Sequence, residues 1–175
     1  MFYVSKSLTS CLCILFLQRR RNLGSLARAR RLAAAGNIKG ASFVILLSST
    51  YFISYFLGCG RSTNTRSQLL ALWALLTVSF HLGIPLLSVY GDSQVIISWV
   101  NRKASLNAPL LSHWCDDILS LLQLVPLVTI NHIYREHNQQ ADILSKQALM
   151  LPHGHRTFFK YLDGRIIDQG DLQLF

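Results

Sequence analysis

The sequence predicts an α/β domain with a partly parallel sheet, and three observations lead to this prediction. Short runs rich in Phe, Val, Ile and Tyr alternate along the chain with longer segments of helical periodicity. Gly, Pro and Ser residues separate these runs, as expected at turns and helix ends. Apolar residues make up 51% of the 175-residue chain, which is enough for a sizeable core. Strands that alternate with helices are typical of α/β layers.

The first predicted elements are two strands and a long helix. Residues 41–47 and 50–57 have strand composition, and the polar Ser48 and Ser49 lie between them. Residues 67–82 have apolar side chains at helical spacing, and Gly83 with Pro85 beyond it marks a helix end. Further along the chain we expect a strand at 86–90, a short helix at 93–101, a helix at 109–123 capped by Asn107, a strand at 128–134 and a final helix from Asn138 to about Met150.

The charge is distributed unevenly, and this limits where carboxylate chemistry can lie. The formal net charge is +9, which suggests a polyanionic partner, either nucleic acid or an anionic membrane surface. Residues 1–91 contain ten Lys and Arg and no acid, and the first acid is Asp92. Any site built from carboxylates must therefore take them from the second half.

The predicted organisation is a basic leader at residues 1–35, a domain at 36–150 and a weakly patterned tail at 151–175. In the leader an apolar run at 11–17, too short to span a bilayer, precedes Arg19, Arg20 and Arg21. A transit peptide remains open, but we prefer a disordered or non-native leader. None of the four cysteines forms a C-x-x-C pair, which favours a reducing intracellular setting, nuclear or cytoplasmic.

A membrane protein is the competing interpretation of the apolar stretches. Residues 40–60 and 67–91 carry no formal charge, and each stretch is long enough to cross a bilayer. The first stretch has the composition of strands, and the second divides naturally into a helix and a strand. A soluble α/β domain without membrane contact is therefore the preferred interpretation.

Two carboxylates and a histidine are the candidates for chemistry. Asp92 follows a predicted strand and precedes a helix, the position at which α/β sheets place their sites, although it could simply cap that helix. Asp142 lies in the first turns of the final helix, where an acid is also favourable for the helix itself. His132 could carry protons near neutral pH, although a lone histidine is more often a surface or packing residue.

Three motifs together resemble the ribonuclease H (RNase H) family, especially the domains of plant retroelement polyproteins. They are T-N-T-R-S-Q-L-L-A-L-W from Thr63, G-D-S-Q-V-I-I-S-W from Gly91 and N-H-I-Y-R-E-H-N-Q-Q-A-D-I-L-S-K from Asn131. The resemblance covers residues 36–149 and more faintly 162–170. It implies a five-stranded mixed sheet flanked by helices, and metal-dependent hydrolysis of the RNA strand of an RNA–DNA hybrid with two Mg²⁺ or Mn²⁺ ions held by carboxylates.

The resemblance also implies roles for individual residues. Asp92 and Asp142 correspond to metal-binding catalytic acids, and His132 corresponds to the loop histidine that helps product and proton leave. Three amides correspond to positions that contact the hybrid: Asn37, Asn64 and Gln94.

The chain departs from the family at two of its four carboxylates. The first-strand acid, six residues before Asn37, corresponds to Arg31, and the acid of the first long helix corresponds to Gln68. The helix-favouring residues 28–35 also bring the first strand itself into question. We therefore expect a nucleic-acid-binding RNase H-type domain with weak or no hydrolysis. A retroelement remnant without function, or a small membrane protein, remains an alternative.

Overall fold

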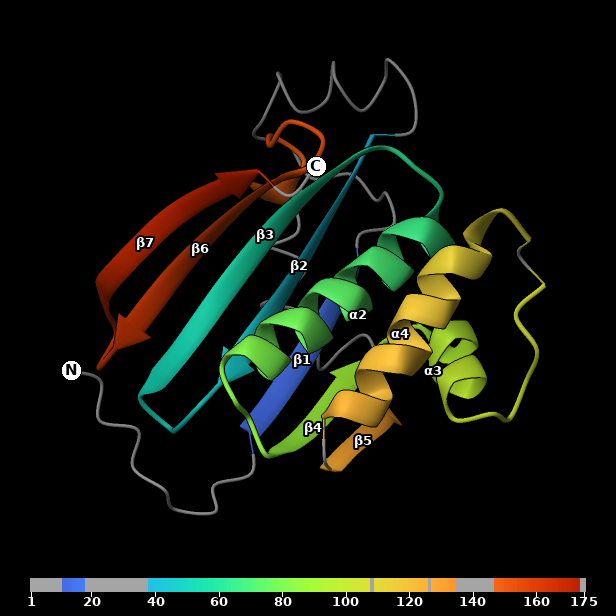
Figure 1. Ribbon diagram of the computed structural model, residues 1–175. Coiled ribbons are helices and arrows are strands. Elements are labelled where there is room, and N and C mark those ends of the chain that lie inside the picture. The colour runs from blue at the N-terminus through green and yellow to red at the C-terminus, as the bar shows by residue number, and fades with distance from the viewer. Residues whose placement is uncertain (1–10, 18–37, 108, 126, 135–146, 174–175) are drawn as a thin grey trace.

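A mixed β-sheet with helices packed on one face forms the fold (Figure 1). The computed structural model describes residues 11–17, 38–107, 109–125, 127–134 and 147–173. Within these ranges the sheet has seven strands in the order β5-β4-β1-β2-β3-β6-β7. The strands are β1 (Cys11–Leu17), β2 (Ile38–Leu46), β3 (Tyr51–Arg61), β4 (Leu86–Gly91), β5 (Leu127–His132), β6 (His155–Leu162) and β7 (Arg165–Gln173). The predicted α/β class is confirmed.

The helices of the described chain are α2 (Asn64–His81), α3 (Gln94–Val100) and α4 (Ser112–Leu124), and the short 3₁₀ turn η1 (Pro109–Leu111) precedes α4. The predicted stop of α2 is confirmed, because Gly83 has φ +64° and its N–H donates to the carbonyl of Phe80. The predicted Asn107 cap is wrong. Leu111 occupies the N-cap position of α4, since η1 forms the first turn instead.

The core lies between the sheet and α2. We expected α2 to be amphipathic, but its side chains are buried on most sides because α4 packs over its outer surface. Trp73 of α2 meets Trp114 of α4 edge to face, with ring centroids 5.3 Å apart. The largest fully buried side chains come from the strands, α2 and α4: Phe43, Ile45, Ile53, Leu57, Leu69, Leu72, Leu75, Leu76, Leu87, Val89 and Ile118.

An interior strand comes from the segment that the sequence analysis assigned to a leader. β1 pairs antiparallel with β2 and parallel with β4, so it is an interior strand of the sheet. Its sequence, CLCILFL, is the continuous apolar run expected of an interior strand. This corrects the placement of the first strand near Arg31. Arg31 itself lies outside the described residues, as do the predicted helix at 28–35 and most of the final helix.

The C-terminal part also differs from the predicted tail. β6 and β7 form a hairpin, and β6 pairs antiparallel with β3, which adds two strands to the five that the resemblance implied. Asp163 and Gly164 both have positive φ at the turn between them. No helix in the described ranges is long and apolar enough to cross a membrane.

Candidate active site

Asp92 lies where three parallel strands end. β4 runs between β1 and β5 and is parallel to both, so the carboxyl ends of these strands meet at one edge of the sheet. Leu87, Val89 and Gly91 of β4 are buried and fix the strand in place. Asp92 follows directly, and its Oδ1 atom is withdrawn from solvent. Ser93 occupies the N-cap position of α3, one residue after Asp92.

The structure brings His132 to the same edge. It is the last residue of β5, where it pairs with Gly91, and the next residue, Ile133, donates its N–H to the Gly91 carbonyl over 2.9 Å. The imidazole is partly buried, and the ring of Tyr134 meets it edge to face at 5.6 Å. Asp92 therefore follows β4 directly and His132 ends the neighbouring strand β5, while the catalytic roles of both residues stay predictions.

The start of α2 lies toward the edge at which β4 ends, because α2 precedes β4 in the chain and runs in the opposite direction. A short loop joins His81 to Leu86, so α2 and β4 run in opposite directions (Figure 1). Thr63 caps the helix by accepting the N–H of Arg66 at 3.2 Å. Asn64 is exposed in the first turn, and Gln68 is partly buried one turn later. The helix thus presents an amide where the family resemblance implies a carboxylate.

Gln94 lies in the first turn of α3, two residues after Asp92, and is exposed. Its side-chain amide donates to Ser98 Oγ over 2.9 Å, which holds it along the helix surface. Sequence analysis missed Asn101 at the end of α3. Its Nδ2 donates to the Ile130 carbonyl over 2.8 Å and so fixes α3 against β5. The signal for this role is an amide residue at a helix end, which is too common to be decisive.

The sheet register defines the first-strand position that faces Asp92. Leu15 pairs with Gly91, so continuing the register places Phe16 beside Asp92. β1 contains no acid. Within the described ranges no group of three or more His, Cys, Asp or Glu could hold a metal ion. Asn37 and Asp142 lie outside these ranges, so their predicted roles stay predictions.

Comparison with known proteins agrees with this architecture. The family described as reverse transcriptase-like matches residues 39–148. No curated protein matches the chain significantly. RNase H1 from the halophilic archaeon Halobacterium salinarum NRC-1 is similar in structure, with a TM-score of 0.60 and 21% identity over 81% of this chain and 98% of that chain.

Two structures solved with nucleic acid are also similar. LC11-RNase H1 in complex with RNA/DNA hybrid has a TM-score of 0.62 and 21% identity, over 80% of this chain and 96% of that chain. The foamy viral protease-reverse transcriptase in complex with RNA/DNA hybrid has a TM-score of 0.54 and 15% identity, over 86% of this chain and 21% of that chain. The chain therefore belongs to the reverse transcriptase-like family and has a ribonuclease H-like fold.

Proposed function

We propose that this chain is a nucleic-acid-binding domain of the RNase H type that binds RNA–DNA hybrid and hydrolyses it weakly or not at all. One observation carries the proposal: Asp92 and His132 end neighbouring strands at one sheet edge, while α2 contributes Gln68 and β1 contributes no acid. This arrangement supports a site that binds nucleic acid but lacks part of the negative charge that the family resemblance implies. Two similar structures, LC11-RNase H1 and the foamy viral enzyme, are complexes with RNA/DNA hybrid.

The residues that the structure describes at this edge do not fit a pair of divalent metal ions. Two such ions, ~3.5–4 Å apart, carry four positive charges and need several anionic oxygens. Asp92 supplies one negative charge, and Asp142 could supply a second. At ~4 Å and an effective dielectric near ~20, each missing unit charge costs on the order of 4 kcal/mol. That corresponds to roughly a thousandfold in metal occupancy or rate. We therefore derive no metal-dependent step for this chain.

Hybrid binding needs positive charge and polar groups rather than metals. Asn64 and Gln94 are exposed amides on the first turns of α2 and α3, and these are suitable partners for 2′-hydroxyls and minor-groove edges. Arg102 and Lys103 are exposed directly after α3, where they can contact phosphates. These contacts follow the A-form shape of the duplex and require no base sequence. We expect the chain to prefer hybrid over duplex DNA of the same sequence.

Cleavage and binding assays on one labelled hybrid test the proposal. The unaltered chain should bind the hybrid, and cleavage with Mg²⁺ or Mn²⁺ should stay near background. Asp92→Asn should leave binding intact or strengthen it, because it removes a negative charge beside the phosphates. Duplex DNA of the same sequence is the matched control. Robust cleavage that Asp92→Asn abolishes would show that the charge argument is wrong.

The second candidate is a retroelement remnant without function. The replaced carboxylates favour this candidate as much as they favour a binding domain without hydrolysis. The two candidates differ in binding. A remnant is under no selection to bind hybrid more tightly than duplex DNA, so equal affinity for both would favour the remnant. A clear preference for hybrid would favour the binding domain.

A further inference from the structure

The helices of the described ranges lie over only part of the sheet. In Figure 1, α2, α3 and α4 lie over the middle and one side of the sheet, while β6 and β7 extend beyond them. Tyr55 of β3 belongs to the core under α2, so it projects from the helix-bearing face. In the sheet register Leu57 pairs with Arg156, Tyr55 with Phe158 and Ile53 with Lys160, so these β6 side chains project from the same face. We call Tyr55, Arg156, Phe158 and Lys160 the hairpin face.

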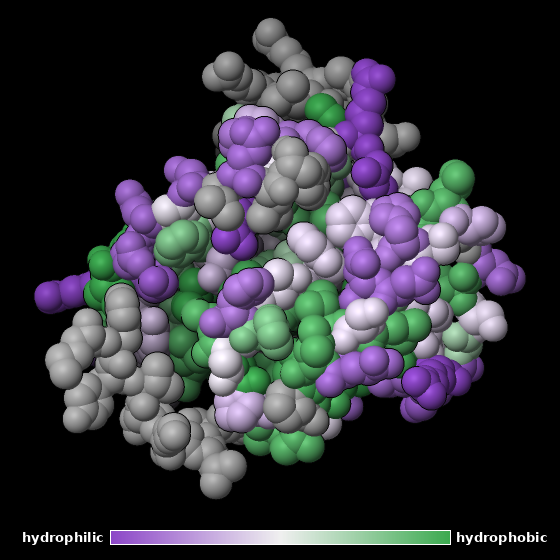
Figure 2. Space-filling model, viewed as in Figure 1, coloured by the Kyte–Doolittle hydropathy of each residue, from purple (hydrophilic) through white to green (hydrophobic). Residues whose placement is uncertain are grey.

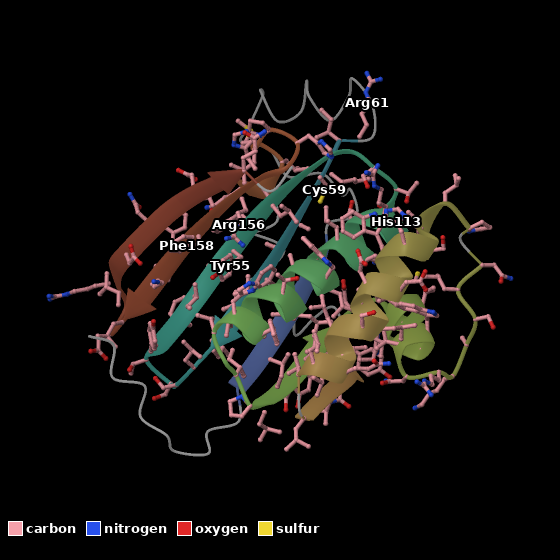
Figure 3. The ribbon with its side chains drawn as sticks, viewed as in Figure 1. Tyr55, Cys59, Arg61, His113, Arg156 and Phe158 are labelled. Atoms are coloured by element: carbon pink, nitrogen blue, oxygen red, sulfur yellow. The ribbon has the colours of Figure 1, made fainter. Side chains whose placement is uncertain are left out.

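Aromatic rings connect the core to this face. Phe43 and Tyr55 stack with their centroids 4.7 Å apart, and the next ring, Phe158, lies 5.8 Å from Tyr55. Tyr55 is only 8% exposed, whereas Phe158 is partly exposed. Figure 3 shows Tyr55, Arg156 and Phe158 together on β3 and β6. The outermost ring of the row is therefore open to a ligand.

The backbone beneath Phe158 holds its ring in place. Gly170 of β7 pairs with Phe158, and a Cβ at Gly170 would lie 2.7 Å from the ring. The missing side chain lets the ring lie against the backbone of β7, while Tyr55 packs beside it. A ring fixed in this way loses little conformational freedom on binding, so it is a preformed surface for stacking.

The face carries two positive charges, and among the described residues only one of them forms an ion pair. Lys160 lies 5.4 Å from the Phe158 ring, but Asp168 forms an ion pair with it at 2.6 Å. Arg156 is different: its Nε is buried and has no hydrogen-bond partner among the described residues. Because Nε is shielded from solvent, a ligand would meet the terminal Nη atoms of the guanidinium, and phosphate is a suitable partner for them. In Figure 2 hydrophilic and hydrophobic residues lie side by side over β6 and β7.

We propose that the hairpin face binds a single-stranded stretch of nucleic acid, with a base stacked on Phe158 and a phosphate at Arg156. Aromatic rings interleaved with cations on an open sheet are the usual means of binding single strands. This inference rests on the proposed function, because β3 leads from the hairpin face to Asn64 at the start of α2. At ~3.3 Å per extended residue, Leu57 and Asn64 are separated by at most roughly 25 Å. A short overhang on a bound hybrid can span that distance.

The test uses the full chain and two labelled probes in fluorescence anisotropy titrations. One probe is a blunt RNA–DNA hybrid, and the other is the same hybrid with a single-stranded oligouridine tail of about six nucleotides. The tail should raise the affinity of the unaltered chain about tenfold, which is the gain expected from one stacked base and its phosphate contact. Phe158→Leu and Arg156→Gln should each lose most of this gain and leave affinity for the blunt hybrid unchanged.

Arg165→Gln is the matched control, because it removes one positive charge from the far end of the same hairpin. It should keep the gain from the tail. If the blunt hybrid binds but the tail adds nothing, the inference fails and the proposed function stands. If neither probe binds, both fail. Polyglutamate and free oligouridine can be compared as competitors of the tailed probe. If polyglutamate competes equally well, the surface binds acidic proteins, and base stacking is overturned.

A second measurement avoids the risk that a variant fails to fold. A 5-bromouridine tail can be photocrosslinked to the unaltered chain and the attached peptide identified by mass spectrometry. A crosslink on the β6 peptide that contains Phe158 is the expected result. Crosslinks confined to other peptides would overturn the inference.

Discussion

Gly40 and Gly58 face each other across β2 and β3, at the point where the C-terminal part of the chain crosses the sheet. A Cβ at Gly40 would lie 2.7 Å from Ala148, and one at Gly58 would lie 2.1 Å from the carbonyl oxygen of Pro152. Gly154 also donates its N–H to the Gly58 carbonyl over 2.9 Å. These glycines are needed for close backbone approach, and they connect β6 and β7 to the rest of the fold.

Gly58→Ala should therefore be strongly destabilising. The added methyl meets backbone atoms that cannot rotate away, and overpacking of this kind typically costs about 1–3 kcal/mol, occasionally more. Gly83→Ala is the control, because its methyl meets nothing within 4 Å and only the positive φ is strained, at a cost of about 1 kcal/mol. Urea unfolding would measure both variants. Equal losses would contradict a special role for the crossing at Gly58.

Cys59 gives the fold a dependence on high pH. Burial raises the pKa of this thiol from 9.0 to about 11. Below pH 9 the thiol is protonated in both folded and unfolded chains, so its raised pKa does not change the free energy of unfolding. Between about pH 9 and 11 the unfolded chain loses the proton while the folded chain retains it, and stability falls by about 3 kcal/mol.

Unfolding free energies measured from pH 8 to 11 would show this fall, and Cys59→Ala should make it smaller. Tyr55 also has a raised pKa because of burial, so part of the fall should remain in the variant. A pH profile that Cys59→Ala leaves unchanged would show that the thiol does not contribute.

At the scale of elements, the register of β1 determines where a substituted carboxylate would restore the site. Leu15 pairs with Gly91, and continuing this register by one residue places Phe16 beside Asp92. Phe16→Asp with Gln68→Glu should therefore restore two carboxylates at that edge. We expect cleavage of RNA–DNA hybrid that depends on added Mg²⁺ or Mn²⁺ and rises well above that of the unaltered chain. The measurement is initial rate on a labelled hybrid.

Leu15→Asp with Gln68→Glu is the control for that repair, since neighbouring strand residues project from opposite faces. It carries the same charge and should stay inactive. Equal activity in both double variants would mean that the register of β1 does not determine the site.

Sequence patterns predicted the elements from β2 to β5 because each has a clear period and a Gly, Pro or Ser boundary. They did not identify β1. An apolar run followed by three arginines fits a leader as well as a strand, and only pairing with β2 and β4 distinguishes the two. The hairpin was missed for a related reason: β7 mixes Asp, Gln and Gly with apolar residues, so its alternation is weak. The edge that joins Asp92 and His132 was predictable from motif order, whereas Arg156 and Phe158 carried no motif.

At the scale of the whole molecule, net charge should govern affinity. The chain carries a formal charge of +9, with its ten N-terminal cations uncompensated in sequence. Binding to phosphates releases counterions, so the logarithm of affinity should fall linearly with the logarithm of salt concentration. Anisotropy titrations between about 50 and 200 mM salt would measure the slope. An affinity that stays flat over this range would contradict a phosphate-dominated interface.

The position of β1 also affects how the molecule is made. Strand β1 is synthesised well before its parallel neighbour β4, because Cys11 pairs with Leu87, and β3 precedes its partner β6 by a still longer stretch of chain. Contacts so distant in sequence slow folding, because the intervening chain must close before they form. The apolar CLCILFL segment stays without its parallel neighbour throughout that interval. The nascent chain is therefore most prone to aggregation after β1 and before β4 has been synthesised, and chaperone supply should limit its yield more than the stability of the finished fold.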